Sequence, residues 1–260
     1  MVIPYARQSI SKLDLNAVAE VLQSDYLTQG PVVPAFEEAI AHLVAARFAV
    51  AGNSATSMLH IACLALGVTT GDLVWTSPIS FVASANCALY CGAEIDFVDI
   101  DSESFNMSPI ALAAKLELAK KSNRLPKVII PVHMGGQSCD MQAIGSLAQQ
   151  YGIKVIEDAS HAIGGTYNSQ RIGNCAHSDI TIFSFHPVKI ITTGEGGMAV
   201  TQDEGLAHSM RMLRSHGITR DATEFEFGND GPWYYEQQEL GFNYRLTDIA
   251  AALGLSQLQR

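Results

Sequence analysis

A repeated alternation of short apolar segments with segments of helical periodicity most constrains the fold. The predicted strands are residues 48–51, 73–76, 94–98, 128–132, 155–157, 180–185 and 198–201. The predicted helices are residues 11–24, a segment that begins near Pro34, and residues 58–66, 81–91, 108–121, 141–151, 204–215 and 246–260. Apolar strands that alternate with helices are typical of a mostly parallel sheet covered on both faces. The sequence therefore predicts an α/β fold.

Two stretches do not fit this alternation. Residues 219–238 are polar and aromatic without a clear period, so we expect a long loop, and such loops in compact domains are usually functional or mobile. The predicted helix 246–260 has no C-cap signal and reaches the last residue. We therefore expect either a fragment or a chain whose partner surface lies elsewhere.

Composition limits the class of protein. With 260 residues and 48% apolar content the chain can bury a sizeable core. Its net charge of −10 argues against nucleic acid as a partner. No apolar run is long enough to cross a bilayer, and the N-terminal residues lack a secretory signal, so we expect no membrane partner. Five scattered cysteines without metal-binding spacing indicate reduced thiols in a cytoplasmic protein.

Lys189 stands among apolar neighbours, between the predicted strand 180–185 and the Gly-rich turn 194–197. Burial disfavours a charged ammonium and lowers the pKa of a lysine. Such a lysine has a free amine near neutral pH, as Schiff-base chemistry requires. The alternative is a surface lysine in the loop after a strand, and the spacing alone favours neither interpretation.

Asp158 directly follows the predicted strand 155–157. Ligands of open α/β sheets bind at the carboxyl ends of the strands. A buried aspartate there needs a positive partner, because its pKa would otherwise rise. The protonated ring nitrogen of pyridoxal phosphate would be such a partner. The alternative for Asp158 is a helix cap or a turn residue.

A pyridoxal phosphate enzyme also needs a phosphate cradle and a ring-stacking group. Residues 54–56 stand where a strand turns into a helix, and free amides with the helix dipole make such a place an anion site. Ser184 offers a hydroxyl to the same phosphate, and Phe81 offers a face to a flat ring. Each position has an ordinary alternative, namely a helix cap, a strand serine and a core phenylalanine.

These elements belong to a set of motifs that resembles a known family. The motifs are Asn-Ser-Ala-Thr-Ser (53–57), Glu-Asp-Ala-Ser-His-Ala (157–162), Ser-Phe-His-Pro-Val-Lys (184–189), Thr-Thr-Gly-Glu-Gly-Gly (192–197), Arg-Ser-His-Gly (214–217) and Gly-Phe-Asn-Tyr-Arg (241–245). In this order, and over essentially the whole chain, they resemble the DegT/DnrJ/EryC1/StrS nucleotide-sugar aminotransferases. The resemblance implies the aspartate-aminotransferase fold of type I and pyridoxal 5'-phosphate as the cofactor.

The resemblance also implies a role for each motif residue. Lys189 would form the Schiff base and shuttle the proton, Asp158 would pair with the ring nitrogen, and His161 would lie near the ring's phenolic oxygen, where many relatives have Gln. The other cofactor-binding positions are Ser54, Ala55, Thr56 and Ser184 at the phosphate, Phe81 on the ring, and Asn243 at the cofactor of the other subunit. The positions that match substrate contacts are Tyr5, Asp25, Tyr26, Leu27, Thr28, Ala55, Ser184 and Asn243.

On this basis we expect three parts in the chain and a homodimer with a shared active site. Residues 1–30 would form an N-terminal segment with a substrate loop, residues 31–245 the large cofactor-binding domain, and residues 246–260 the start of a helix. In the family that helix leads to a smaller C-terminal domain, and nothing follows Arg260 here. An inactive, truncated fragment therefore stays open as an alternative.

The similarity within the family implies a particular reaction. Tyr5 and residues 27–30, 78–86 and 252–258 look most like members that move an amino group from L-glutamate to C4 of a UDP-linked 4-keto-6-deoxy-N-acetylhexosamine, in pseudaminic acid biosynthesis. Pyridoxamine phosphate would be the intermediate form of the cofactor. Another nucleotide-linked keto sugar stays open as the substrate. Lys189 argues against a sugar dehydratase of the same fold, which would carry His there, and the spacing of the histidines gives a metal hydrolase little support.

Overall fold

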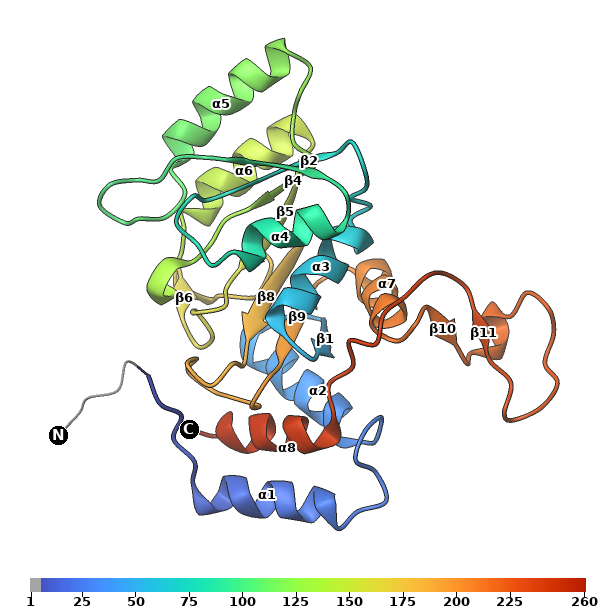
Figure 1. Cartoon of the computed structure of the whole chain (residues 1–260). Helices are drawn as coiled ribbons and strands as arrows, with labels where there is room; N and C mark the ends of the chain where they lie inside the picture. The colour runs from blue at the N-terminus through green and yellow to red at the C-terminus, as the bar shows by residue number, and fades with distance from the viewer. Residues whose placement is uncertain (1–5) are drawn as a thin grey trace.

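The computed structural model describes residues 6–260, and a seven-stranded sheet forms its centre. The order across the sheet is β1-β9-β8-β5-β4-β2-β3 (Figure 1). The strands are β1 (Phe48–Gly52), β2 (Leu73–Thr76), β3 (Glu94–Phe97), β4 (Val128–Ile130), β5 (Lys154–Asp158), β8 (Ile180–Ser184) and β9 (Gly197–Thr201). Each strand lies within two residues of its predicted position, so the sequence located the sheet well.

The predicted mostly parallel sheet is confirmed. Strands β3, β2, β4, β5 and β8 run parallel to one another, and β9 runs antiparallel to both β8 and β1. Residues 185–196 join β8 to β9 and contain no helix, whereas a parallel pair is usually joined by a crossover helix. The turn carries Lys189 and therefore leaves and re-enters the sheet at one edge, where β8 ends.

Helices cover both faces of the sheet (Figure 1). The helices are α1 (Lys12–Leu22), α2 (Val32–Val44), α3 (Ala55–Ala65), α4 (Ala83–Tyr90), α5 (Pro109–Lys121), α6 (Met141–Tyr151), α7 (Glu204–Arg214) and α8 (Asp248–Gln257). One face packs against α3, α4 and α7. The other packs against α2 and α8 at one end and against α5 and α6 at the other. Alternate strand residues enter different cores, as Ile182 and Phe183 do.

Several helix boundaries differ from the prediction by a few residues. Ser54 caps α3, which starts three residues before the predicted helix, and its side chain accepts a hydrogen bond from the Ser57 amide. Helix α4 begins at Ala83, so Phe81 precedes the helix instead of opening it. Helix α8 ends at Gln257, before the predicted end at Arg260. These shifts leave the order of elements unchanged.

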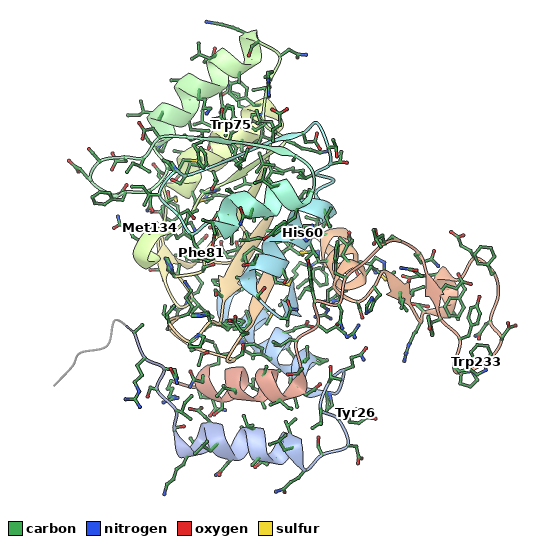
Figure 2. The ribbon with its side chains drawn as sticks, in the orientation of Figure 1. Tyr26, His60, Trp75, Phe81, Met134 and Trp233 are labelled. Atoms are coloured by element: carbon green, nitrogen blue, oxygen red, sulfur yellow. The ribbon has the colours of Figure 1, made fainter. Side chains whose placement is uncertain are left out.

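The predicted loop 219–238 is not wholly irregular. It forms a projecting arm with Trp233 near its tip (Figures 1 and 2). A short antiparallel pair, β10 (Ile218–Thr219) and β11 (Glu236–Gln237), closes its base, and η2 (Ala222–Glu224) lies within it. The Glu236 carboxylate accepts hydrogen bonds from the amides of Glu226 and Phe227. Contacts within the arm therefore fix its path.

Three smaller elements complete the description. Strands β6 (Thr166–Tyr167) and β7 (Gln170–Arg171) form a short hairpin, and the 3-10 turn η1 (Met134–Gly136) follows β4.

Helices α1 and α8 pack against each other (Figure 1). In the part of the chain from residue 6 to residue 260, no helix combines the length and the apolar character that crossing a membrane requires.

Candidate active site

A cavity of about 680 Å³ lies at the carboxyl ends of β5 and β8. It is the place where open α/β sheets hold their ligands. The sequence-predicted residues that line it are Ser54, Ala55, Thr56, Phe81, Asp158, His161, Ser184 and Lys189. The structure therefore brings together residues from β5, β8, the start of α3, the segment before α4, and the turn between β8 and β9.

Asp158 is the last residue of β5 and is 4% exposed. Its Oδ2 accepts a hydrogen bond from Ser84 Oγ at 2.6 Å. Its Oδ1 accepts from the amide and the hydroxyl of Ser160, at 3.1 and 2.6 Å. A carboxylate has about four acceptor positions, so these three donors leave capacity for one more. Asp158 lines the cavity, and a cationic N–H donor bound there would complete its set.

Lys189 lies half-buried in the turn after β8, and its amide donates to the carbonyl of His186 at 2.9 Å. Burial lowers the pKa of Lys189, and the nearby Asp158 carboxylate opposes that shift only in part. The Nζ atom makes no hydrogen bond or ion pair to any residue from 6 to 260. A lysine with a lowered pKa and no protein partner has an amine available for nucleophilic chemistry.

His161 lies three residues after Asp158, and it is held by the 3-10 turn η1. The amide of Gly135 donates to His161 Nδ1 at 3.3 Å. Burial lowers the pKa of His161, the Lys189 charge lowers it further, and the Asp158 charge acts in the opposite direction. The imidazole is therefore neutral at neutral pH, and since Nδ1 accepts, its proton is on Nε2. His161 offers one N–H donor to the cavity.

The start of α3 forms a cradle for an anion. As the first helical residues, Ala55 and Thr56 have amides without an intrahelical acceptor. A Cβ at Gly197 would lie 2.4 Å from the Ala55 nitrogen, so only glycine lets β9 pass this close to the helix start. The buried Oδ1 of Asn53, which also lines the cavity, has no hydrogen-bond partner within the described residues. Free amides and the helix dipole suit a phosphate group.

Ser184 and Phe81 complete the lining of the cavity. Ser184 is buried, and its hydroxyl makes no hydrogen bond within residues 6–260, so it is free to bind a ligand. Phe81 is 71% exposed beside α4 (Figure 2), which excludes the alternative of a core residue. Its ring therefore offers an open face to a flat ligand.

The structure does not bring every predicted residue to this cavity. Asn243 is exposed and does not line it. The expected substrate contacts at residues 25–28 are also exposed and outside it, and Tyr26 instead lines a groove between α1 and α8. Tyr5 lies outside the described residues. The cavity of one chain thus contains the expected cofactor residues except Asn243, and only part of the expected substrate set.

Sequence reasoning missed the two serines that hold Asp158. Ser160 stands two residues after Asp158, a spacing at which aspartates commonly form turns, so this contact had a local signal. Ser84 is 74 positions away in the sequence, and nothing local indicates that it meets Asp158. Ser80 extends the chain of hydroxyls, with its Oγ 2.7 Å from Ser84 Oγ.

This arrangement fits pyridoxal phosphate. An unpartnered lysine amine, a carboxylate with one free acceptor position and a neutral imidazole donor surround the same cavity, and an anion cradle closes one end. The carboxylate suits the ring nitrogen, the cradle suits the phosphate, and the amine suits the aldehyde. The donor set therefore matches each functional group of the cofactor.

Comparison with known proteins agrees with this chemistry. The model of the DegT/DnrJ/EryC1/StrS aminotransferase family matches residues 8–260. The chain is 42% identical over 258 residues to the spore coat polysaccharide biosynthesis protein SpsC of Bacillus subtilis. It is 41% identical over 258 residues to the UDP-4-amino-4,6-dideoxy-N-acetyl-beta-L-altrosamine transaminase of Campylobacter jejuni. Both alignments cover 99% of this chain and 64% of the relative, so the chain spans less than two thirds of their length.

Solved structures have the same fold. PseC of Helicobacter pylori, an aminotransferase involved in the biosynthesis of pseudoaminic acid, has a TM-score of 0.89 and 33% identity, over 100% of this chain and 66% of that one. The sugar aminotransferase Spr1654 of Streptococcus pneumoniae, described as putative and solved in its PLP and PMP forms, has a TM-score of 0.87 and 28% identity. It is matched over 100% of this chain and 67% or 66% of those chains. The chain belongs to the DegT/DnrJ/EryC1/StrS aminotransferase family, whose enzymes depend on pyridoxal phosphate.

Proposed function

We propose that this chain forms the cofactor-binding part of an aminotransferase that acts on a nucleotide-linked keto sugar. One observation carries the proposal: the unpartnered amine of Lys189 and the Asp158 carboxylate, with its remaining acceptor position, share one cavity. An amine nucleophile and an acceptor for a protonated ring nitrogen are the two groups that pyridoxal phosphate chemistry requires. Membership of the family supports the same activity.

The residues of the cavity would divide the work. Pyridoxal phosphate, when bound, supplies an electrophilic aldehyde and a ring that accepts electrons. The Lys189 amine would hold the aldehyde carbon between turnovers, and once released it would move a proton to or from the carbon that gains or loses nitrogen. Asp158 would keep the ring nitrogen protonated. His161 would donate its Nε2 proton to the ring's phenolic oxygen.

The remaining residues would bind and orient. The amides and hydroxyls of residues 54–56 and the hydroxyl of Ser184 would hold the phosphate, because the start of α3 combines free donors with the positive end of a helix dipole. Phe81 would cover one face of the ring from the mouth of the cavity. Together these contacts would leave the aldehyde facing Lys189.

The more specific reaction is the transfer of nitrogen from L-glutamate to C4 of a UDP-linked 4-keto-6-deoxy-N-acetylhexosamine, in pseudaminic acid biosynthesis. Similarity to the Campylobacter transaminase and to PseC supports it. The second candidate is amination of another nucleotide-linked keto sugar. Its support is the 42% identity to SpsC, which is named for spore coat polysaccharide.

We also propose a homodimer with a shared site, in the cytoplasm. Asn243 is exposed outside the cavity, although its carbonyl accepts a hydrogen bond from the cavity residue Asn53 at 3.5 Å. From there its side chain is free to contact the cofactor of a second copy. The proposed division of the chain at residues 30 and 245 would assign residues 25–28 to a substrate loop. Because residues 25–28 lie outside the cavity of their own chain, they would contact a sugar only at a site that includes the second copy of the chain.

Replacement of Lys189 by Ala tests the proposal. We expect the variant to lose the visible absorbance of the covalently held cofactor, its response to L-glutamate, and amino transfer by the full-length protein. Lys121→Ala, at an exposed position at the end of α5, is the matched control and should behave like the wild type. Amino transfer retained by Lys189→Ala would show that another group is the nucleophile.

A further inference from the structure

The turn between β8 and β9, residues 186–196, is the lysine loop. Its hydrogen bonds are almost all internal or to Phe185 at the end of β8: Lys189 N donates to His186 O, and Thr192 Oγ1 and Thr193 N both donate to Phe185 O. On either side of Lys189, Val188 is 47% and Ile190 is 63% exposed. The direct neighbours of the lysine thus pack little, and the nearest buried apolar side chain of the loop is Ile191, which is 5% exposed in the core beside α2 and α8.

One hydrogen bond joins this loop to a distant element. The amide of Thr192 donates to Gln257 Oε1 on α8 at 3.2 Å, and the two residues are 65 positions apart. Within the described chain no other hydrogen bond from residues 186–195 reaches beyond residues 185–196. Both Thr192 and Gln257 are buried, so water does not replace this bond if it is lost.

The nitrogen of the Gln257 side-chain amide is also hydrogen-bonded. Its Nε2 donates to the Ser9 carbonyl at 2.8 Å and to Asp14 Oδ2 at 3.1 Å. Asp14 is fully buried on α1 and also accepts from Ser256 Oγ at 2.7 Å. Two acceptors lie on one side of the amide and one N–H donor on the other, so only one orientation satisfies them. The side chain is a fixed link between α1, the segment before it and the lysine loop.

We infer that Gln257 is a positioning residue that holds the lysine loop so that the Lys189 amine stays in the cavity. The inference rests on the role proposed for Lys189. Thr192 is three residues after Lys189, and an unmade bond at its buried amide would favour a loop that moves toward water. In water the ammonium is no longer disfavoured by burial, so the pKa of Lys189 would return toward its ordinary value.

The test compares Gln257→Met with Gln259→Met, both in the cofactor-free chain. Methionine has a similar length and removes the amide, whereas Gln259 is exposed in the turn that follows α8 and its side chain makes no hydrogen bond within the described residues. We expect amide hydrogen exchange in residues 186–193 to be about tenfold faster or more in Gln257→Met, and unchanged in the control. Equal exchange in the two variants would overturn the inference.

A second readout addresses Lys189 itself. The pH midpoint of its reaction with an amine-modifying reagent, followed by peptide mass spectrometry, should rise by about half a unit or more in Gln257→Met. The midpoint reports the pKa and does not depend on how accessible the amine is. Faster exchange of the loop with an unchanged midpoint would mean that Gln257 has a structural role only, and would overturn the inference.

The conservative variant Gln257→Glu separates the two ends of the link. It keeps an acceptor for Thr192 but sets a carboxylate oxygen against Ser9 O and Asp14 in place of the donor. Repulsion there should make residues 9–14 exchange faster, while the loop and the Lys189 midpoint stay close to the wild type. Loss of loop protection in this variant would contradict the assigned contact. If Gln257→Met does not fold, amide hydrogen exchange of the wild type is the test. The Thr192 amide should then exchange about 100-fold more slowly than the Ile190 amide, and equal rates would overturn the inference.

The inference and the proposed function fail in different ways. A raised Lys189 midpoint in Gln257→Met, together with amino transfer retained by Lys189→Ala, would support the positioning and reject the catalytic role of the lysine. An unchanged midpoint, together with complete loss of activity in Lys189→Ala, would reject the positioning and support the proposed function.

Discussion

Glu157 and Asp158 are neighbouring carboxylates at the end of β5, and both are buried. Because side chains alternate along a strand, the two point to opposite faces of the sheet. Glu157 faces His133, Ser178 and Thr181, and all three hydrogen-bond to it. Asp158 faces the cavity and is held by two serines that leave part of the carboxylate uncommitted.

The difference lies in how completely the protein satisfies each carboxylate. His133 Nε2 donates to Glu157 at 2.7 Å, and His133 Nδ1 accepts from the Cys139 amide at 3.1 Å, so this network closes on itself. A closed network of buried polar groups contributes to structure and has no free position for a ligand. An unfinished set of partners beside a cavity therefore identifies a binding carboxylate better than burial does.

The largest expected effect is that of Asp158→Asn. The amide keeps an acceptor for the serines but cannot hold a proton on the ring nitrogen by charge. We expect kcat/KM of the full-length protein to fall about 10³-fold or more, with a change in the free energy of unfolding within about 1 kcal/mol. Steady-state kinetics and urea unfolding measure the two quantities. Glu157→Gln is the matched control and should keep most of the activity; the opposite order of the two variants would refute the comparison.

Glu157→Ala should have the opposite profile. It leaves the buried groups of His133, Ser178 and Thr181 without their common acceptor, which we expect to cost about 3 kcal/mol in the free energy of unfolding. Activity per folded molecule should change little. Urea unfolding followed by circular dichroism gives the first quantity, and kinetics normalised to cofactor content gives the second. Asp158→Ala should lower the free energy of unfolding less than Glu157→Ala, because the two serines that lose their acceptor lie beside the cavity, where water can then reach them.

Local patterns in the sequence predicted the fold and pointed to the main groups of the candidate site. Buried strands with continuous apolar residues, followed by capped helices, predicted the sheet and its order of elements. Lys189 and Asp158 were predicted because each follows such a strand, and residues 54–56 were predicted because they stand where a strand turns into a helix. The structure places all three around one cavity.

Contacts between distant residues were not predictable in this way. Ser84 meets Asp158 across 74 positions, and Gln257 meets Thr192 across 65. Glu157 has nearly the same local sequence signals as Asp158, and only the alternation of the strand and the closed network show that it is structural. The base of the arm at residues 218–237 pairs residues whose sequence has no strand pattern. Tertiary packing determines each of these features.

Acid conditions should reveal the contribution of Glu157 to stability, and we expect this effect to be smaller than those of the two substitutions above. Burial opposes ionisation of Glu157, but hydrogen bonds from His133, Ser178 and Thr181 outweigh it and hold its pKa below the ordinary 4.5. A carboxyl with a lowered folded pKa contributes stability that is complete above 4.5 and is lost as the pH falls through the folded pKa. The free energy of unfolding of the wild type should therefore fall more steeply below pH 4.5 than that of Glu157→Gln. Parallel urea titrations across that range measure both slopes, and equal slopes would contradict the closed network.

Ser84→Ala tests the incomplete set of partners around Asp158, and its expected effect is the smallest. Ser84 is fully buried and donates to Asp158 Oδ2 at 2.6 Å, while Ser160 continues to hold Oδ1. Loss of one of these donors should let the carboxylate turn away from the ring nitrogen. We expect kcat/KM to fall about tenfold, equivalent to about 1.4 kcal/mol, together with a shift in the pH at which the absorbance of the bound cofactor changes.

Two variants separate orientation of Asp158 from simple loss of packing. Ser84→Thr keeps the hydroxyl and should restore most of the activity and the wild-type absorbance titration. Ser80→Ala removes a group that contacts Ser84 but not Asp158, so we expect an effect of about threefold or less. If Ser84→Ala lowers the melting temperature but leaves the absorbance titration unchanged, the serine stabilises α4 only. The orientation of Asp158 then depends on Ser160 and on the bound ring nitrogen.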